Sequence, residues 1–381
     1  MELYVHIPFC RQKCRYCSFT SYVRKEALHE AYINHILNEA SFRACEAETP
    51  LTTVYIGGGT PSVLSPSLFR KLIRGLKKIY NWENVSEFTT EANPGTVSAE
   101  WLEAAADEGV NRISFGMQAS QPHLLSTLGR IHQTDEVASS VQLSRDSGIS
   151  NISLDLIFGI PGQTEVDWTD TLEYALSLKP CHISAYGLIP EEGTPLYHDL
   201  QSGLLRLPDP DTERAMYNKA ILLLGLHGFS RYEISNFALK GYECKHNIGY
   251  WTQEPYIGLG VSAASMTGLM FFPDGMTYHR RTNPDRLEEY FDMVDRNAEA
   301  PDEVISSEEA RFETIMLGLR LNEGVNEDTF LRKHHISLEK YIGDKLHKFE
   351  RDGLMTHENK NWKMTERGFD IQNAVLVELM D

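Results

Sequence analysis

Residues 1 to about 235 alternate between short apolar runs and longer segments with a helical spacing of apolar positions. The short runs are rich in β-branched and aromatic residues and predict strands, whereas apolar residues recurring every three or four positions predict amphipathic helices. The predicted strands are residues 3–7, 53–56, 87–91, 112–117, 152–158 and 182–188, and the predicted helices are 27–45, 67–80, 99–108, 134–147 and 166–177. Six such units predict a parallel sheet with right-handed crossovers, either doubly wound or an incomplete β/α barrel.

The pattern changes after residue 235, and it divides the chain into three segments. We predict a barrel domain at 1–235, a connecting segment at 236–305 with an irregular HNIGYW stretch, and a C-terminal domain at 306–381. The last segment shows three helical patterns, then two short strands around a polar turn, which is typical of a winged-helix-like module. The predicted fold class is therefore α/β, an incomplete parallel (β/α)6 barrel followed by a small α+β domain.

Composition narrows the classes of partner. The formal net charge is −18, which disfavours nucleic acid and charge-driven binding to anionic membranes, because both need a basic surface. Hydrophobic residues make up 41% and charged residues 24%, as in ordinary globular proteins. The longest uncharged stretch, 256–273, is too short and too polar for a confident membrane span. We expect a cytoplasmic protein without a signal peptide and without nucleic acid as a partner.

Unusual residues follow each predicted strand. The three N-terminal cysteines come after the first strand, GGGTP after the second, EANP at the end of the third and GMQ at the end of the fourth. The fifth strand carries Asp155 and leads into GIPGQ, and the sixth ends in YGL. The carboxyl ends of parallel strands meet at one edge of a sheet or barrel, and ligands bind there. We therefore expect one site built from these loops.

Three of the six cysteines, Cys10, Cys14 and Cys17, lie within eight residues in a CxxxCxxC motif. Three thiolates in one loop can bind three irons of a [4Fe–4S] cluster, which leaves the fourth iron open. An open iron can chelate the amino and carboxylate groups of a methionine, and reduction can then release an adenosyl carbon radical. The alternative is a zinc site completed by His6 or Cys45, but the spacing differs from the usual zinc patterns.

These motifs carry a resemblance to a known family. CxxxCxxC after a first strand, followed by a glycine-rich loop, resembles the radical S-adenosylmethionine superfamily. HIPFCxxxCxYC, GGGTP, EANP, FGMQ, GRIH, DLIFGIPGQT and HNIGYW together resemble the oxygen-independent coproporphyrinogen III oxidase family, and within it the HemW-type heme chaperones. The resemblance covers essentially the whole chain. It implies a [4Fe–4S] cluster with three cysteine ligands, S-adenosylmethionine and heme.

The resemblance also implies which residues meet the methionine part of the cofactor. Gly58, Gly59 and Thr60 would face its amino group, since glycine lets the backbone approach a ligand closely. Glu91 would accept a hydrogen bond from the ammonium. The plainer alternatives are a tight turn at the glycines and a surface acid at residue 91.

Further residues of the same edge receive roles by resemblance. Gln118 and Asp155 would hold the ribose hydroxyls, while Arg130 offers a planar guanidinium for a carboxylate. Tyr4 and Tyr16 would lie near the cofactor. For each of these residues alone, a structural polar or packing role is the competing interpretation.

Two departures separate this chain from the oxidase branch. The oxidases carry a longer extension before the cluster and a further cysteine where this chain has Phe19, so decarboxylation of coproporphyrinogen III becomes the alternative function. HNIGYW is instead the mark of the heme chaperones, which implies His246 as the heme-iron ligand, with Tyr250 and Trp251 stacking on the macrocycle. The competing ligands in the sequence are Cys244, His182 and His279.

The functional hypothesis is therefore a heme chaperone that passes heme to acceptor hemoproteins, with contact at the inner membrane surface. An enzymatic activity as a coproporphyrinogen dehydrogenase is disfavoured, and no catalytic residue is assigned. The sequence leaves the oligomeric state open, with a homodimer as one option.

Overall fold

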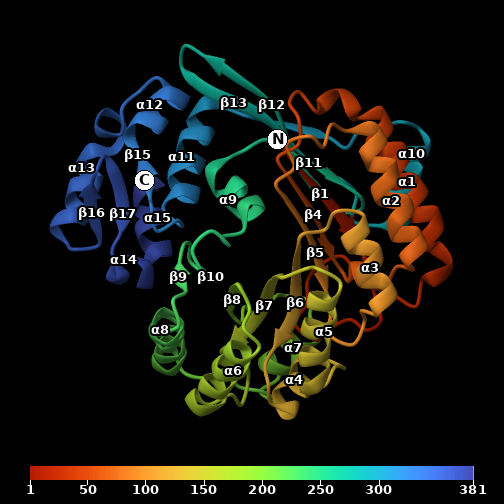
Figure 1. The fold of residues 1–381 in the computed structure, drawn as a ribbon. Coiled ribbons are helices and arrows are strands. Elements are labelled where there is room, and N and C mark those ends of the chain that lie inside the picture. The colour runs from red at the N-terminus through yellow and green to blue at the C-terminus, as the bar shows by residue number, and fades with distance from the viewer. Residues whose placement is uncertain (381) are drawn as a thin grey trace.

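A single curved sheet organises the larger part of the molecule (Figure 1). The computed structural model describes residues 1–380. The strand order is β14-β13-β12-β11-β1-β4-β5-β6-β7-β8-β10-β9, and the sheet does not close on itself. The predicted strands are present as β1 (Glu2–Ile7), β4 (Thr53–Gly58), β5 (Glu87–Ala92), β6 (Arg112–Gln118), β7 (Asn151–Phe158) and β8 (His182–Gly187). They are parallel, so the predicted fold class, an incomplete parallel barrel, is confirmed.

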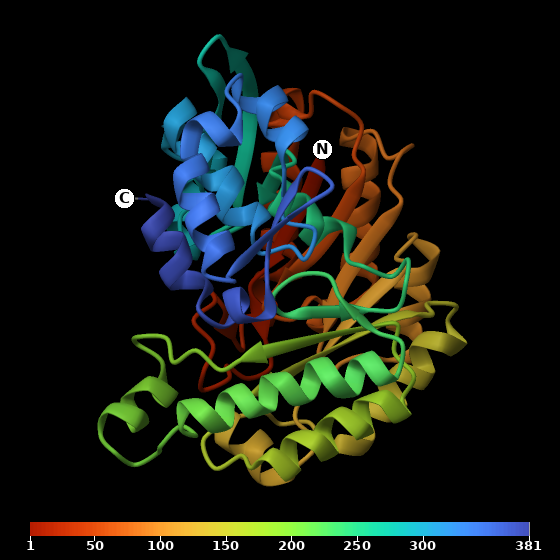
Figure 2. The same cartoon turned by 90° about the vertical axis from the view of Figure 1, so that its left-hand side faces the viewer.

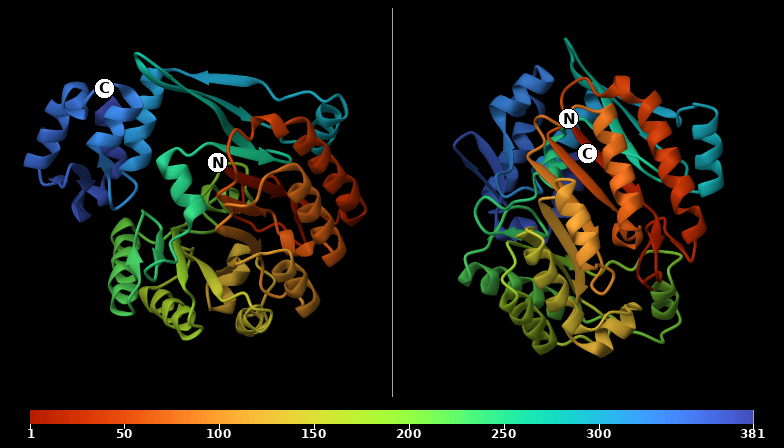
Figure 3. Two further views of the ribbon diagram at one scale, coloured as in Figure 1. Left: turned by 45° about the horizontal axis from the view of Figure 1, so that its top comes forward. Right: turned by 45° about the vertical axis from the view of Figure 1, so that its right-hand side comes forward.

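Helices cover the outer, convex face of this sheet (Figures 1 and 3). They are α1 (His29–Phe42), α2 (Pro66–Ile79), α3 (Ala99–Asp107), α5 (Thr134–Asp146), α6 (Glu165–Ser177) and α8 (Pro210–Leu226). The short helices α4 (Pro122–Leu128) and α7 (Pro195–Gln201) lie instead against the loop that carries Cys14 and Cys17, since the backbone of Arg15 in that loop is hydrogen-bonded to Leu128 of α4 and to Leu196 of α7. In α2 the Ser65 side chain caps the first turn, and Phe69, Leu72, Ile73 and Leu76 recur at helical spacing and are fully buried. The long helix α8 lies beside α6, as Figure 2 shows. The pattern of apolar residues thus decides which face of each helix meets the sheet.

The segment at 236–305 is more than a connection, because it extends the same sheet. Its elements are β10 (Asn236–Ala238), α9 (Lys245–Thr252), β11 (Tyr256–Leu259), β12 (Ala264–Phe272), β13 (Gly275–Thr282), α10 (Leu287–Asp295) and β14 (Asp302–Ile305), and the short β9 (Ser230–Arg231) precedes it. β11 pairs in parallel with β1, while β12, β13 and β14 continue as an antiparallel extension. The boundary at residue 235 therefore cuts between neighbouring strands of one sheet.

The HNIGYW stretch is helical as α9, where an irregular segment was predicted, and that prediction is wrong. Glu87 at the start of β5 supplies the reason. Its carboxylate accepts hydrogen bonds from the backbone N–H of Lys245 at 2.9 Å and of His246 at 3.1 Å. These are donors that a helix leaves unpaired in its first turn. Because the capping group comes from a distant strand, the local sequence carries no sign of it.

The C-terminal segment forms a second unit with its own core (Figure 1). Its elements are α11 (Ser307–Gly318), β15 (Val325–Asn326), α12 (Glu327–His334), α13 (Leu338–Arg351), β16 (Met355–Glu358), β17 (Asn361–Met364), α14 (Glu366–Asp370) and α15 (Gln372–Met380). The strands form a three-stranded antiparallel sheet, and Leu319, Phe330 and Trp362 lie in the core beside it. The unit meets the rest of the molecule through α11, which packs on α9 and β13. In residues 1–380, no helix has both the length and the apolar character that crossing a bilayer requires.

Candidate functional site

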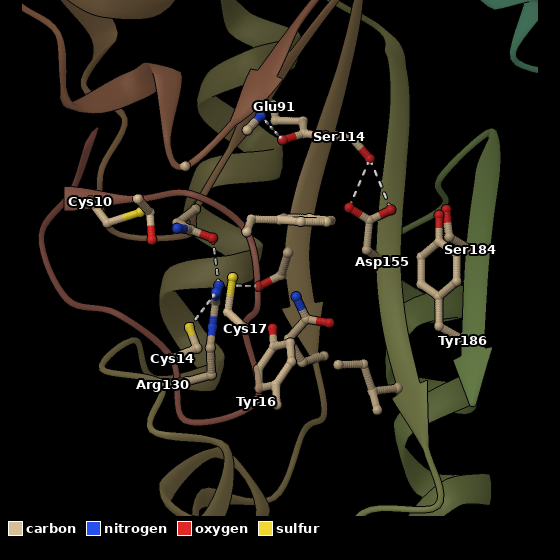
Figure 4. Close-up of a pocket in the computed structure, with 18 of the residues that line it drawn as sticks. Cys10, Cys14, Tyr16, Cys17, Glu91, Ser114, Arg130, Asp155, Ser184 and Tyr186 are labelled. Carbon is tan, nitrogen blue, oxygen red and sulfur yellow. Dashed lines mark hydrogen bonds between the residues drawn. The ribbon is translucent and has the colours of Figure 1, made fainter. Parts of the chain in front are cut away.

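The cysteine loop faces a cavity of about 430 Å³ inside the curved sheet (Figure 4). Cys10 ends the short strand β2 (Phe9–Cys10), which pairs with β3 (Tyr22–Val23), and Cys14 and Cys17 follow in the loop between them. All three cysteines line the cavity, and none forms a disulfide. Burial raises the pKa of the thiols of Cys10 and Cys17. The predicted convergence of the strand-end loops on one cavity is therefore present.

Arg130 forms hydrogen bonds that link the cysteine loop to the ends of the strands. Its Nη2 donates to Asn93 Oδ1 and to the carbonyl oxygen of Gly116, both at 2.6 Å, and its Nη1 donates to the sulfur of Cys14 at 3.5 Å. The guanidinium lines the cavity, and its role in binding a carboxylate stays a prediction. In this arrangement it also places a fixed positive charge beside the sulfur of Cys14.

The glycine loop after β4 is shaped by its close neighbours as well as by the cavity. Gly58 has a φ of +108°, and a Cβ at this position would lie 2.5 Å from the ring of His6. A Cβ on Gly59 would lie 2.8 Å from the carbonyl oxygen of Phe9. Both glycines line the cavity. Thr60 is buried and is not part of the lining, and its hydroxyl donates to the sulfur of Cys10 at 3.6 Å. Thr60 therefore supports the cysteine loop directly.

Glu91 projects into the cavity from the end of β5. It accepts hydrogen bonds from the hydroxyl of Tyr55 at 2.8 Å and from the backbone N–H of Gly58 at 3.0 Å. Burial raises the pKa of its carboxyl group to about 7, against the lowering effect of these two donors. An incoming N–H donor with positive charge would stabilise the ionised form of this buried carboxyl group.

Gln118 and Asp155 lie on neighbouring strands along the same wall. Asp155 accepts hydrogen bonds from the hydroxyl of Ser114 at 2.9 and 3.0 Å, and burial raises the pKa of its carboxyl group. Gln118 has a φ of +65°, and the pairing of β6 with β7 shifts between Gly116 and Gln118. This irregularity ends the regular ladder at the cavity and re-aims the glutamine, as bulges commonly do beside sites.

The two predicted tyrosines lie in different places. Tyr16 lines the cavity beside the cysteines. Tyr4 instead lines a second cavity, of about 600 Å³, on the other side of Glu91, and its hydroxyl donates to His6 Nδ1 at 2.9 Å. The two cavities share Phe19, Gly58 and Glu91 in their linings. Tyr4 therefore does not line the cavity that contains the cysteines.

His246 lines neither cavity and is 1% exposed. Its Nδ1 lies 2.7 Å from Thr53 Oγ1 and its Nε2 lies 2.9 Å from the hydroxyl of Tyr250, so both ring nitrogens have partners. Burial lowers the pKa of the imidazole to about 3, which keeps it neutral. In this conformation neither nitrogen is free for iron, and the assignment of His246 as ligand stays a prediction.

The competing ligands named from the sequence have partners of their own. His182 is bonded to Ser153 and Tyr232, and His279 is paired with Asp302 on the antiparallel extension. The thiol of Cys244 is buried and donates to Glu87 at 3.4 Å. Of the two candidates for completing a zinc site, Cys45 is exposed after α1, and His6 donates from Nε2 to the carbonyl oxygen of Thr20 at 3.0 Å.

Several lining residues escaped the sequence analysis. Tyr55, Ser114, Ser184, Tyr186 and Asn247 line the cysteine cavity, and Asn93 links Arg130 with Thr60. Asn93 stands in the EANP motif and Asn247 in HNIGYW, so a signal was present for both. Tyr55, Ser114 and Ser184 are interior strand positions, where alternation predicts only which face they occupy.

The donor set fits a cluster together with an amino acid–nucleoside ligand. Thiols, which are soft ligands for iron, line one side, and Glu91, Gln118 and Asp155 line the other. Among residues 1–380, no three side chains of His, Cys, Asp or Glu lie close enough together to hold a single metal ion. A [4Fe–4S] cluster does not require three ligands on one metal ion, because each thiolate binds a separate iron at its own corner of the cluster.

Comparison with known proteins identifies the family. The model described as the Radical SAM superfamily matches residues 4–175, and the model described as the HemN C-terminal domain matches residues 305–371. The heme chaperone HemW of Lactococcus lactis is 36% identical over 378 residues, covering 99% of this chain and 96% of that protein. This chain belongs to the HemW family. The HemW protein of Bacillus subtilis is 35% identical over 376 residues, covering 98% of this chain and 97% of that protein.

The fold of this HemW family member is that of a solved relative. The structure of coproporphyrinogen III oxidase (HemN) from Escherichia coli superposes with a TM-score of 0.84 at 21% identity, covering 99% of this chain and 89% of that one. At this identity the likeness concerns the fold. Membership of the radical S-adenosylmethionine superfamily implies a [4Fe–4S] cluster and S-adenosylmethionine, as predicted from CxxxCxxC.

Proposed function

We propose that this protein is a cytoplasmic heme chaperone that binds heme and transfers it to acceptor hemoproteins, with contact at the inner membrane surface. The observation that carries the proposal is its similarity, along nearly its whole length, to proteins named heme chaperone HemW. Phe19 supports the distinction from the oxidases, because it stands where they have a further cysteine. Its side chain is 64% exposed and lines both cavities.

Cys10, Cys14 and Cys17 would hold three irons of the [4Fe–4S] cluster, and the amino and carboxylate groups of S-adenosylmethionine would chelate the fourth. When bound, the cluster supplies the electron for reductive cleavage of the sulfonium. Glu91 would accept a hydrogen bond from an N–H of the iron-bound amino group, and Gly58 and Gly59 let the backbone come close.

The remaining contacts would come from the opposite wall of the cavity. Asp155, oriented by Ser114, and Gln118 would bind the ribose hydroxyls. Arg130 would face the carboxylate while it holds the cysteine loop through Asn93 and Cys14. The cofactor would thus be bound between the cysteine loop and the strands.

The experiment that tests the proposal measures heme transfer. Protein with a reconstituted cluster is expected to bind one heme per chain and to pass it to an apo-hemoprotein, which is followed by the Soret absorption of the acceptor. The control is free heme at the same concentration. Heme that stays free in solution, or that reaches the acceptor no faster with the protein than without it, would contradict the proposal.

The alternative function needs its own assay. The reduced protein is incubated anaerobically with coproporphyrinogen III and S-adenosylmethionine, and the expected result is no formation of protoporphyrinogen. Its formation would show that the protein is a coproporphyrinogen III oxidase, and the chaperone-only interpretation would be wrong.

A further inference from the structure

The hairpin of β12 and β13 extends beyond the rest of the molecule. Its tip lies at the upper edge of the molecule in Figure 1 and stands clear of the neighbouring elements in Figure 2. Phe272 and Gly275 are the last pair of the ladder, so Pro273 and Asp274 form the turn. The three residues before the turn, Met270, Phe271 and Phe272, are 43%, 55% and 45% exposed. An apolar segment therefore lies at a projecting tip of the fold.

The exposure of three consecutive apolar residues departs from the usual pattern of a strand. Successive side chains point to opposite faces of a sheet, so a strand that is packed on one side buries every second residue. Here Met270 and Phe272 share one face and Phe271 lies on the other, and all three are exposed. A flat protein surface would cover only one of these faces, whereas a lipid layer surrounds a projecting tip on every side.

Contacts with the C-terminal unit hold the hairpin in this position. Met276 and Tyr278 of β13 are fully buried and belong to a small apolar core that also includes Ala310 of α11. At the turn, the carboxylate of Asp274 accepts a hydrogen bond from Ser307 Oγ at 2.7 Å, so this acid is bound to the start of α11. The tip is therefore presented by a packed base, and little conformational entropy is lost when it binds.

The charges beside the tip differ from those of the molecule as a whole, whose formal net charge is −18. Helix α12 ends in basic residues and packs against the turn, since a Cβ on Gly275 would lie 3.2 Å from the backbone of His334. Arg332 is exposed in the last turn of this helix. Asp274 and Glu308 are the acids on the same side, so the surroundings of the tip are close to neutral. Repulsion by anionic headgroups is consequently weak at this point of the surface.

We propose that the tip of this hairpin, residues 270–273, inserts into the headgroup region of a phospholipid bilayer. The inference rests on the proposed function and names the element that makes the contact with the inner membrane surface. Charge cannot drive that contact in a chain with a net charge of −18, so the driving force is the transfer of Met270, Phe271 and Phe272 out of water. Arg332 remains among the headgroups beside the tip.

The experiment measures co-flotation of the full-length protein, loaded with its cluster, with vesicles of phosphatidylglycerol and phosphatidylethanolamine. The wild type is expected to float with the vesicles. The double variant Phe271→Ser/Phe272→Ser should lower the partition coefficient at least about tenfold, because two half-exposed rings no longer leave water. Arg332→Gln should weaken binding only about fivefold, and only on vesicles that contain the anionic phosphatidylglycerol.

The matched control removes two exposed apolar side chains from another part of the surface. Leu222 and Leu226 of α8 are 61% and 75% exposed, and this helix lies far from the hairpin in Figure 1. Leu222→Ser/Leu226→Ser should therefore float as the wild type does. Phe272→Trp places a fluorescent reporter at the tip, and its emission in excess of the wild type should be quenched by vesicles with brominated acyl chains.

Three results would overturn the inference. They are flotation of the double tip variant at the wild-type level, an equal loss of flotation in the α8 variant, and absence of bromolipid quenching in Phe272→Trp. A fourth result would assign the tip to a contact between two copies of the chain instead: a dimer of the wild type in sedimentation without vesicles that the double tip variant lacks.

Heme transfer to a soluble acceptor separates this inference from the function on which it rests. The tip is not needed in that assay, so Phe271→Ser/Phe272→Ser should transfer heme at the wild-type rate while it fails to float. Transfer by the wild type without any effect of the tip variants on flotation would contradict the role of the hairpin and leave the chaperone standing. Absence of transfer by the wild type would instead contradict the proposed function.

Discussion

At the scale of single residues, Glu91 shows how burial prepares a side chain for a charged partner. It ends β5 between the two cavities, and it is held by one hydroxyl and one backbone N–H. These two donors offset only part of the desolvation, so the pKa of the carboxyl group remains at about 7. An N–H donor of the cofactor's amino group placed here would lower that pKa and would be bound more tightly by the ionised form.

We therefore expect the affinity for S-adenosylmethionine to rise with pH. With a pKa of about 7, the ionised fraction of Glu91 grows roughly tenfold between pH 6 and pH 8, and affinity should follow it. The measurement is anaerobic calorimetric titration of the cluster-loaded protein at pH 6, 7 and 8. Glu91→Gln should bind more weakly and show only the pH dependence of the ligand itself. Equal slopes for the two proteins would show that Glu91 does not bind the amino group of the cofactor.

At the scale of elements, α9 owes its place to contacts at the amino ends of the strands. Glu2, Thr53 and Glu87 are the first residues of β1, β4 and β5, and each lies against this helix. A Cβ on Gly249 would lie 2.0 Å from the carboxyl group of Glu2, so a larger residue here would force the Glu2 side chain to move. The helix thus sits at the end of the strands opposite to the cysteine loop, and it presents Tyr250 to the larger cavity and Asn247 to the smaller one.

Removing the cap of α9 tests this account of the element. Glu87→Ala leaves the N–H groups of Lys245 and His246 without their acceptor, which should cost roughly 1–3 kcal/mol of unfolding free energy. Urea denaturation followed by circular dichroism measures it. Glu83→Ala, at an exposed acid before β5, should stay within about 0.5 kcal/mol of wild type. Coinciding curves for all three proteins would show that the cap contributes no net stability.

At the scale of the whole molecule, the C-terminal half completes the sheet that the N-terminal half begins. β1 lies between β4 and β11, although β11 is some 250 positions later in the chain, at Tyr256–Leu259. The C-terminal unit then packs on α9, and Lys333 donates to the carbonyl oxygen of Thr252 at 2.7 Å. Its helix α11 thereby becomes a wall of the larger cavity. The larger cavity is consequently built from both parts of the chain.

Truncation tests the predicted boundaries at 235 and 305. A chain ending at residue 235 would expose the edge of β1 and lose α9, and we expect it to aggregate, because an uncovered strand edge pairs with other chains. A chain ending at residue 305 keeps β11 to β14 and should give a larger soluble fraction with a protease-resistant core. Soluble yield and limited proteolysis distinguish them. A stable monomer from residues 1–235 would show that the first boundary is that of an autonomous domain.

The sequence by itself determined the features that depend only on residues close together in the chain. Alternating apolar runs placed six strands and their helices, and CxxxCxxC, GGGTP and EANP placed a cluster motif at the carboxyl edge of the sheet. The tertiary structure decided what depends on residues far apart in the chain: the pairing of β11 with β1, the capping of α9 by Glu87 and the burial of His246 behind Tyr250. Periodicity reports which face of an element is apolar, because that is a property of neighbouring residues. Which distant strand or carboxylate meets that face is settled only when the chain packs.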